Sequence, residues 1–213
     1  MIPITIVDNF LDEPQSLVDL STTLEYQPSP EGLWPGTRSE KLHVVNGQLY
    51  DNIATRVMGL FQSLNDLERG EVDCDMSFQR VPAKFHHGWV HHDNWVYATG
   101  ILYLNDNAGT SLYTRTSSKD FNENHVPIKM KSNLRGYMTE EEKEWQAEYN
   151  NSFQKEVVVK GIYNRLLMFH GNVLHSANSF ETEEDDRLTL VMFFHRISGE
   201  PMPLERMRAV RKV

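Results

Sequence analysis

A chain of 213 residues, of which 39% are hydrophobic and 24% are charged, has the size and composition of one ordinary globular domain. Its formal net charge of −9 disfavours a nucleic-acid partner, because an acidic surface repels a phosphate backbone. The single cysteine, Cys74, excludes an intramolecular disulfide and a cysteine-based zinc site, so a metal site here would use nitrogen and oxygen ligands.

The N-terminal segment predicts a short strand followed by two helices. The letters ITIV indicate the strand, and the first helix should begin near Glu13, because Pro14 suits a first helical turn. A Pro/Gly-rich loop, EYQPSPEGLWPGTRSE, separates it from a second helix near Leu49 to Leu67. The segment carries no secretory signal and the chain has no apolar run long enough to span a membrane, so we expect a cytoplasmic protein.

From Ser77 the pattern becomes strand-like. Five segments are rich in β-branched or aromatic residues and are separated by polar turns: SFQRV, WVYATGILYLN, KEVVVK, RLLMF and RLTLVMFFH. Strands that follow one another without intervening helices favour an antiparallel sandwich or barrel. Between them lies a polar stretch that is irregular until Thr139, which should open a helix with Glu142 as a capping box.

The expected organisation is a single domain over residues 1–213. Residues 1–76 would form a helical N-terminal buttress, and residues 77–198 would form the β core. The polar stretch at 114–154 would be an insertion between two strands. Insertions of this kind carry lids or binding loops, so we expect this one to determine the substrate.

The stretch FHHGWVHHDN places four histidines and one aspartate within ten residues. In an extended strand, side chains two residues apart share a face, so His91 and Asp93 can bind one ion while His92 points away. A third ligand must come from elsewhere in the chain. The candidate histidines are His125, His170, His175 and His195.

The segment RLTLVMFFH indicates a wall that suits a carboxylate. At a spacing of two residues, four of its side chains share one face: Arg187, Thr189, Val191 and Phe193. The planar fork of Arg187 can bind both oxygens of a carboxylate, and the hydroxyl of Thr189 adds one donor. The alternative is that Arg187 pairs with the acidic run ETEEDD just before it.

The order of these residues resembles the iron(II)- and 2-oxoglutarate-dependent dioxygenases, most closely their prolyl-hydroxylase-like branch. The motifs that carry the resemblance follow that family's order: His91-His92-Asp93, Thr99-Gly-Ile-Leu-Tyr103-Leu-Asn105, Gly109-Thr110, His175 and Arg187-Leu-Thr189. The match covers Phe78 to Arg196 without the insertion. The paired glycines of the family's turn are replaced by Ala108-Gly109, and the gap from His175 to Arg187 is slightly long.

The resemblance implies a mainly β fold with flanking helices: a double-stranded β-helix, or jelly roll, of the cupin-like type. Two imidazoles and one carboxylate leave open positions on Fe(II), which admit 2-oxoglutarate and O2. The implied iron ligands are His91, Asp93 and His175. The implied 2-oxoglutarate-binding residues are Arg187, which would hold the distal carboxylate, and its neighbours Thr189, Tyr103 and Thr99.

Other residues around the motif have ordinary explanations. The histidines expected to be exposed or to neighbour the site are His86, His87 and His92. The histidines expected to pack or hydrogen-bond on strands are His170 and His195. Three aromatic residues flank the motif and are expected either to pack or to form a rim for substrate: Trp89, Trp95 and Tyr97.

We therefore expect an oxygenase that uses Fe(II), 2-oxoglutarate and O2 to hydroxylate a peptide, an amino acid or a small metabolite. One alternative is a cupin-like metal enzyme or zinc hydrolase, in which Arg187 would have no carboxylate to bind. Another is a non-catalytic jelly-roll binding protein, in which His91, Asp93 and His175 would not converge. Neither the substrate nor the oligomeric state follows from the sequence.

Overall fold

The computed structural model describes residues 4–60, 72–115, 125–180 and 186–197. The strands in these ranges are β1 (Ile4–Val7), β2 (Tyr26–Pro28), β3 (Thr37–Ser39), β4 (Val72–Val81), β5 (Ala98–Tyr103), β6 (Asn107–Arg115), β7 (Phe153–Gly161), β8 (Leu166–His170), β9 (Leu174–Ala177) and β10 (Arg187–Ile197). The α-helices are α1 (Gln15–Thr23), α2 (Leu42–Val45), α3 (Gly47–Met58), α4 (His125–Arg135) and α5 (Glu140–Asn151). A short 3-10 turn spans Ala83–Phe85.

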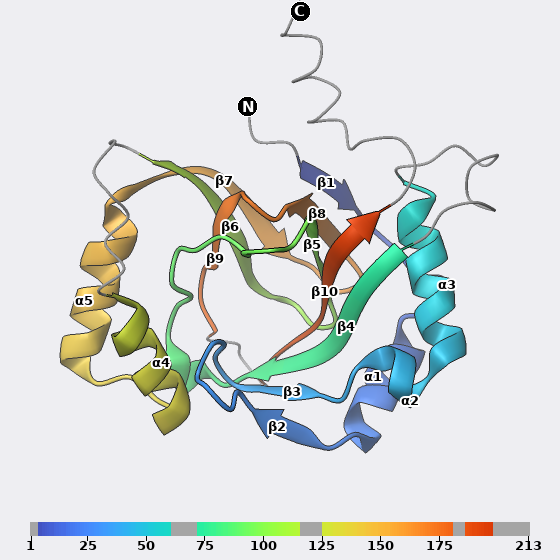
Figure 1. Cartoon of the computed structure of the whole chain (residues 1–213), viewed down its shortest axis with the longest axis horizontal. Coiled ribbons are helices and arrows are strands. Elements are labelled where there is room, and N and C mark those ends of the chain that lie inside the picture. Colours follow the sequence, from blue (N-terminus) through green and yellow to red (C-terminus); the bar gives the residue numbers. More distant parts are fainter. Residues whose placement is uncertain (1–3, 61–71, 116–124, 181–185, 198–213) are drawn as a thin grey trace, which may run out of the picture.

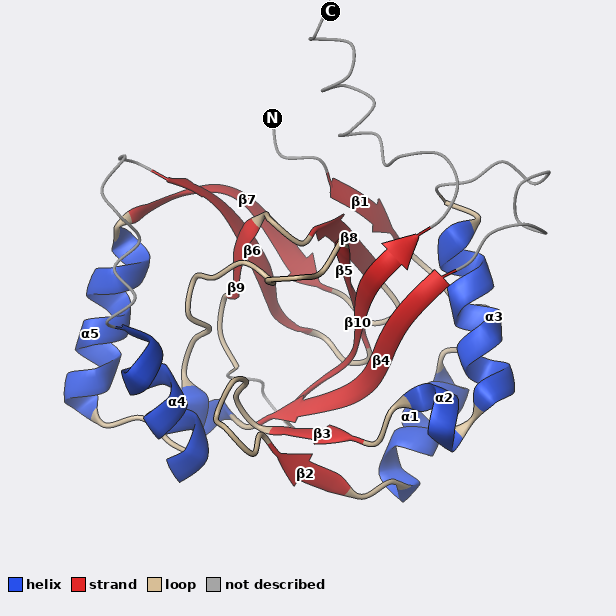
Figure 2. Cartoon of the chain, in the orientation of Figure 1, coloured by secondary structure: helices blue, strands red, loops and turns tan. Residues whose placement is uncertain are grey.

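The strands form two antiparallel sheets. The larger sheet has the order β1-β8-β5-β10-β4-β3-β2, and the smaller has the order β7-β6-β9. Figure 1 shows the sheets around a common interior, and Figure 2 shows α1, α2 and α3 on one side of them and α4 and α5 on the other. Side chains from both sheets meet in a buried cluster that includes Tyr103, Leu112 and Phe169. Two antiparallel sheets that face each other in this way are the arrangement of a jelly roll.

Strand β10 separates the hydrophobic core from the interior between the sheets. Its even-numbered residues pack into the largest core cluster together with residues of α1 and α3: Leu188, Leu190, Met192 and Phe194. Its odd-numbered residues point the other way, and Arg187, Val191 and Phe193 line a cavity. Because both faces of β10 are covered, the strand reads as a nearly continuous apolar run.

The N-terminal segment is less helical than expected. The predicted strand is present as β1, which pairs with β8, and the first predicted helix is present as α1. The segment predicted as a Pro/Gly-rich loop also contains β2 and β3, and β3 extends the larger sheet by pairing with β4. The second predicted helix corresponds to α3, and the part of that prediction beyond residue 60 lies outside the described residues.

The insertion contains two helices where the sequence predicted one. The capping box of α5 is confirmed: the Thr139 hydroxyl accepts from the backbone N–H of Glu142, and the Glu142 carboxylate accepts from the backbone N–H of Thr139. The stretch before Thr139 was expected to be irregular, but it forms α4. That helix is mostly polar, so its sequence lacks the apolar periodicity by which a buried helix is recognised.

A bulge in β6 explains the glycine of the Gly-Thr motif, which lies within a strand here. The pairing of β6 with β7 shifts register between Asn107 and Thr110. Gly109, between them, has φ +80°, and a Cβ there would lie 1.9 Å from the carbonyl oxygen of Val159. Only glycine fits this position. The bulge leaves Thr110 buried, where its hydroxyl accepts a 2.8 Å hydrogen bond from Tyr103.

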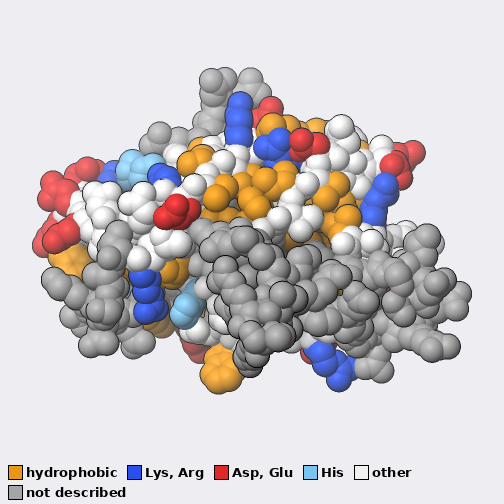
Figure 3. Space-filling view, turned by 90° about the horizontal axis from the view of Figure 1, so that it is seen from above, with side chains coloured by type: hydrophobic (Ala, Val, Ile, Leu, Met, Phe, Trp, Pro, Cys, Tyr) orange, Lys and Arg blue, Asp and Glu red, His pale blue; other side chains and the backbone are white. Residues whose placement is uncertain are grey.

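The surface view in Figure 3 shows hydrophobic side chains near the centre of one face and acidic side chains gathered at the end where α5 lies. Helix α5 itself has three glutamates in its first turn: Glu140, Glu141 and Glu142. No helix in the described ranges has the length and apolar character needed to cross a bilayer.

Candidate metal centre

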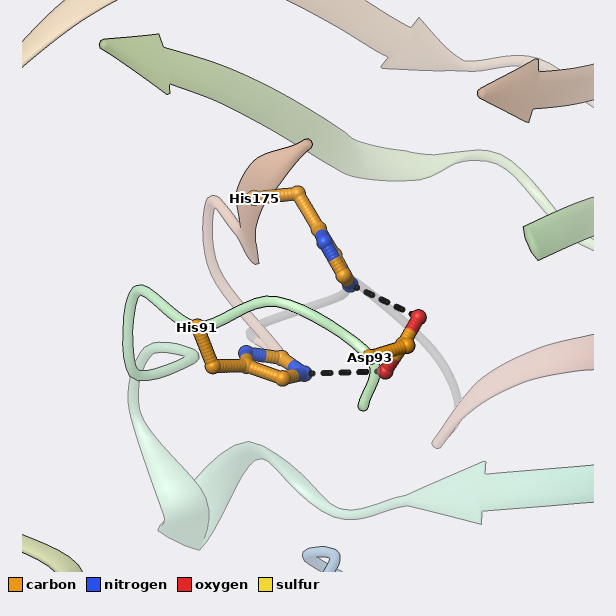
Figure 4. Close-up of side chains that lie close together, drawn as sticks. All are labelled: His91, Asp93 and His175. Carbon is orange, nitrogen blue, oxygen red and sulfur yellow. Dashed lines mark ion pairs between the residues drawn. The ribbon is translucent and has the colours of Figure 1, made fainter. Parts of the chain in front are cut away.

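Three side chains that the sequence brought forward converge between the two sheets. His91, Asp93 and His175 each offer a ligand atom, and these atoms lie within 4.8 Å of one another. Nε2 of His91 is 3.7 Å from one carboxylate oxygen of Asp93, and Nε2 of His175 is 3.6 Å from the other (Figure 4). These distances are too long for hydrogen bonds and leave space for an ion among the three groups. In the described part of the chain, no other group of histidine, cysteine and acidic residues has this geometry.

The backbone positions the two histidines. His91 lies in the loop after β4, and an isolated bridge joins it to His175 on β9 through two backbone hydrogen bonds of 3.0 and 2.8 Å. Nδ1 of His91 lies 2.7 Å from the carbonyl oxygen of Trp89, and Nδ1 of His175 lies 3.0 Å from that of Val173. A carbonyl oxygen only accepts, so each Nδ1 carries the proton and each Nε2 keeps a lone pair directed at the shared space.

The carboxylate of Asp93 is held by a hydrogen bond that the sequence did not predict. Thr99, on β5, donates its hydroxyl proton to Asp93 Oδ2 at 2.5 Å, and the backbone N–H of Asp93 donates to the carbonyl of Gly171 at 2.9 Å. Burial opposes ionisation of Asp93, but the neighbouring histidines, Thr99 and Arg38 outweigh it and lower its pKa. Asp93 is therefore an anion, as a metal ligand must be.

The electrostatics of His91 also suit a ligand. Burial is the largest cause that lowers its pKa well below the ordinary value, and the positive charge of Lys129 lowers it further. The ring is therefore neutral at physiological pH. Two imidazoles and one carboxylate form the ligand set that leaves open positions on non-haem Fe(II).

A cavity of about 390 Å³ extends from this cluster to Arg187. Arg187 is 5% exposed, its Nε atom has no hydrogen-bond partner, and it forms no ion pair with any described residue. Burial lowers its pKa, and Tyr103 partly offsets this effect. The predicted alternative partner was the acidic run at 181–186. Its residues 181–185 lie outside the described residues, and no ion pair joins the described Asp186 to Arg187.

The three residues predicted to bind 2-oxoglutarate together with Arg187 lie in different parts of the site. On β10 and β5, Thr189 is paired with Tyr103, and the fully buried hydroxyl of Thr189 has no hydrogen-bond partner. The guanidinium of Arg187 lies 5.7 Å from the centre of the Tyr103 ring. Thr99 lines the cavity nearer to the metal cluster, where it holds Asp93. Arg187 has no described carboxylate partner and the Thr189 hydroxyl has no hydrogen-bond partner. Both groups are withdrawn from water, so they suit an anionic ligand with oxygen acceptors.

The other candidate histidines do not join the cluster. His125 is buried in a stack with Tyr149, their ring centres 4.0 Å apart. Nδ1 of His170 accepts from the backbone N–H of Asn172 at 3.2 Å, and His195 lies 3.5 Å from a carboxylate oxygen of Asp75. The histidines that line the cavity without joining the cluster are His87 and His92. Of the flanking aromatic residues, Trp89 lines the cavity, Trp95 is exposed and Tyr97 packs against the core.

Two cations in the cavity were not selected as site residues by the sequence. Arg38 comes from β3, and Lys129 comes from α4 within the insertion. Burial, the main cause, lowers the pKa of Arg38 to about 10 and that of Lys129 to about 8, and attraction to Asp93 opposes both shifts. The insertion had been expected to carry a binding element, but no sequence pattern distinguished Lys129 from the other basic residues there.

The fold and the cluster together define the class of this protein: a double-stranded β-helix with two histidines and one carboxylate between its sheets. The chain belongs to the family described as "Family of unknown function (DUF6445)", whose profile matches residues 1–194. A search of curated proteins finds no match.

Solved structures with this fold include three that were determined with ligands. The epimerase SnoN in complex with Fe3+, alpha ketoglutarate and nogalamycin RO is 13% identical, with a TM-score of 0.55 over 97% of this chain and 84% of that one. HygX from Streptomyces hygroscopicus, with nickel, 2-oxoglutarate and hygromycin B bound, is 14% identical, with a TM-score of 0.55 over 91% and 83%. EvdO2 from Micromonospora carbonacea var. aurantiaca, complexed with 2-oxoglutarate, is 13% identical, with a TM-score of 0.54 over 95% and 91%. The expected jelly-roll fold is confirmed.

Proposed function

We propose that this protein is an Fe(II)- and 2-oxoglutarate-dependent oxygenase that hydroxylates a small metabolite, an amino acid or a peptide. The observation that carries the proposal is the buried guanidinium of Arg187. It lies in the same cavity as His91, Asp93 and His175 and has no described carboxylate partner. A buried, unpaired cation is costly, so its retention is best explained by an anionic ligand that binds there. The solved structures of the same fold that hold 2-oxoglutarate support this choice of ligand.

Each residue of the site has a defined part in this proposal. His91 and His175 would bind the metal through Nε2, and Asp93 would bind it through its carboxylate. Arg187 would bind the distal carboxylate of 2-oxoglutarate, with the Thr189 hydroxyl as an additional donor. When bound with 2-oxoglutarate and O2, iron at this site would supply the oxidising power for attack on a C–H bond, with 2-oxoglutarate as the co-substrate that is oxidised to succinate and CO2.

The remaining residues position these groups and exclude water. Thr99 keeps the Asp93 carboxylate oriented, and the carbonyls of Trp89 and Val173 fix the histidine rings. The apolar cavity wall includes Val191 and Phe193 and limits access of water to the reacting groups.

The geometry argues against the alternatives. A binding protein without catalysis would not need two imidazole lone pairs and a carboxylate directed at one point, yet His91, Asp93 and His175 have this arrangement. A metal hydrolase, or a cupin-like enzyme that does not use 2-oxoglutarate, gives no reason for the unpaired Arg187 deep in the cavity. A cytoplasmic location stays a prediction.

The test is an anaerobic titration of the protein with Fe(II) and 2-oxoglutarate, followed by the visible charge-transfer band of the iron chelate. Wild-type protein should develop the band only when both components are present. Arg187→Met should need at least about tenfold more 2-oxoglutarate, because it lacks the charge-assisted hydrogen bonds to the distal carboxylate. Arg56→Met is the matched control, since Arg56 forms a surface ion pair with Asp12 at 2.8 Å.

Thermal unfolding without ligands separates loss of binding from loss of fold. Arg187→Met replaces an unpaired buried cation with an apolar side chain of similar length, so the metal-free variant should remain folded. Absence of the band in folded, iron-loaded wild-type protein would remove 2-oxoglutarate from the proposal. Retention of full 2-oxoglutarate affinity in Arg187→Met would contradict the role given to Arg187.

A further inference from the structure

Three cations and one carboxylate line the cavity in the part of the chain that the structure describes. The carboxylate is Asp93, the candidate metal ligand, and one cation is Arg187, which the proposed function assigns to 2-oxoglutarate. Arg38 and Lys129 remain. Neither side chain forms an ion pair or a hydrogen bond with any described residue, although both are close enough to Asp93 for electrostatic attraction. The cavity is therefore positively charged within a chain whose net charge is −9.

The two remaining cations come from segments far apart in the sequence that are tied to each other. Asn133, one turn after Lys129 on α4, donates a 2.8 Å hydrogen bond to the carbonyl of Gly32 in the loop before β3. Gly32 has φ +71°, and a Cβ there would lie 2.3 Å from the carbonyl oxygen of Met130. This close approach places the strand that carries Arg38 and the helix that carries Lys129 on the same cavity, as the position of the β2–β3 loop near α4 in Figure 1 also indicates.

The guanidinium of Arg38 lies close to two aromatic rings. Its central carbon lies 4.3 Å from the centre of the Trp34 ring and 5.1 Å from that of Phe193, and its Nε atom is buried without a partner. A guanidinium whose carbon contacts an aromatic ring can still donate its N–H groups to a planar or tetrahedral oxyanion. Lys129 supplies a second positive charge to the same cavity. The positive charges of Arg38 and Lys129 repel each other. An anion bound between them would offset this repulsion.

Part of the cavity wall is apolar. It includes Leu33, Trp34, Phe85, Met138 and Phe193. The cavity thus pairs an oxyanion-binding side with a hydrophobic side, and its volume of about 390 Å³ limits the occupant to a small molecule or a single side chain.

We propose that Arg38 and Lys129 bind a carboxylate or phosphate group of the substrate, so that the enzyme acts on a small organic anion with an apolar body. The statement that the bound anion is oxidised rests on the proposed function, whereas the anion site formed by Arg38 and Lys129 does not. Because both cations lie near Asp93, the anionic group would lie close to the metal position. The C–H bond to be oxidised would then be near that group rather than at the far end of the molecule.

The test uses matched probes on the full chain by calorimetry, with and without Ni(II) and 2-oxoglutarate. The probes are 3-phenylpropionate, its neutral isostere 3-phenylpropanamide, and phenyl phosphate. At least one anion should bind wild-type protein at least about tenfold more tightly than the amide, and the tighter of the two identifies the oxyanion. Arg38→Met and Lys129→Met should each remove most of that preference. Lys143→Met is the control, because Lys143 pairs with Glu140 on exposed α5.

The same variants separate this proposal from the proposed function. Arg38→Met and Lys129→Met should keep the 2-oxoglutarate affinity of wild type, while Arg187→Met should lose it and keep probe binding. If 2-oxoglutarate fails to bind wild type but the anionic probe binds through Arg38 and Lys129, the anion site stands and the proposed reaction falls.

Two results would overturn the anion site. One is equal affinity for the acid and amide probes in wild-type protein. The other is an anion preference that Arg187→Met abolishes and Arg38→Met leaves intact, since the probe would then occupy the position assigned to 2-oxoglutarate. If Arg38→Met does not fold, Arg38→Lys tests the same point: it keeps the charge but loses the planar fork, and anion affinity should fall at least about threefold.

Discussion

Replacing Thr99 by valine tests whether the site depends on the hydrogen bond to Asp93. The substitution conserves shape and removes only the hydroxyl, which donates to Asp93 Oδ2 at 2.5 Å. The Asp93 side chain is 14% exposed, so solvent cannot replace the lost donor well. A hydrogen bond to a charged group is worth about 1.5–3 kcal/mol. We expect the free energy of unfolding of the metal-free protein to fall by about that amount, and metal affinity to fall at least about tenfold because the carboxylate is less well oriented.

Thr189→Val provides a matched control on the neighbouring strand. Thr189 is also fully buried, but its hydroxyl has no partner in the described structure, so valine should leave stability unchanged or raise it by about 1 kcal/mol. Urea unfolding followed by circular dichroism measures stability, and titration with Ni(II) measures metal affinity. Equal urea midpoints for Thr99→Val and Thr189→Val, together with equal Ni(II) affinities, would refute the role assigned to the Thr99 hydroxyl.

Three further predictions concern pH, the bulge and the insertion. Metal-free protein should lose stability as the pH falls below 6.5, because His91 takes up a proton in the unfolded chain but not in the folded protein. Urea unfolding between about pH 5 and 8 measures this dependence of the unfolding free energy on pH, and His91→Gln should weaken it. Gly109→Ala should lower the free energy of unfolding by about 1–3 kcal/mol, since it combines a positive φ with a clash against the Val159 carbonyl. A urea midpoint equal to that of wild type would contradict the bulge. Thr139→Ala should lower the free energy of unfolding by about 1 kcal/mol, because it removes the cap of α5, and Thr139→Ser should keep most of the wild-type value.

The strand faces and the pairing of His91 with Asp93 could be predicted because they depend on local spacing. Alternation along β10 put Arg187, Val191 and Phe193 on one side, and in the structure these three side chains line the cavity. The His-x-Asp spacing selected His91 and Asp93, which converge with His175 although they do not lie on an extended strand: His91 forms an isolated bridge with His175, and Asp93 lies in the loop that follows. Residue order along the chain sufficed here, since these residues lie on the strands of the jelly roll or in the loop between two of them.

Arg38 and Lys129 could not be predicted because their positions depend on contacts between distant segments. Strand β3 is three residues long and has no hydrophobic alternation; it exists through its pairing with β4. Helix α4 is mostly polar, and the face it turns toward the cavity is set by its contact with Gly32. Neither interaction leaves a periodic pattern in the sequence. The hydrogen bond from Thr99 to Asp93, six residues before it, was also not predicted, and the role of Thr99 toward 2-oxoglutarate stays a prediction.

The two-sided burial of β10 has a consequence for how variation in this strand would be tolerated. Substitutions at its even-numbered positions alter packing against α1 and α3, while those at Arg187, Val191 and Phe193 alter the contents of the cavity. A saturation scan of the strand, scored in parallel for protein abundance and for ligand binding, should therefore alternate residue by residue between the two phenotypes. Deletion of one residue would exchange the faces and abolish both at once.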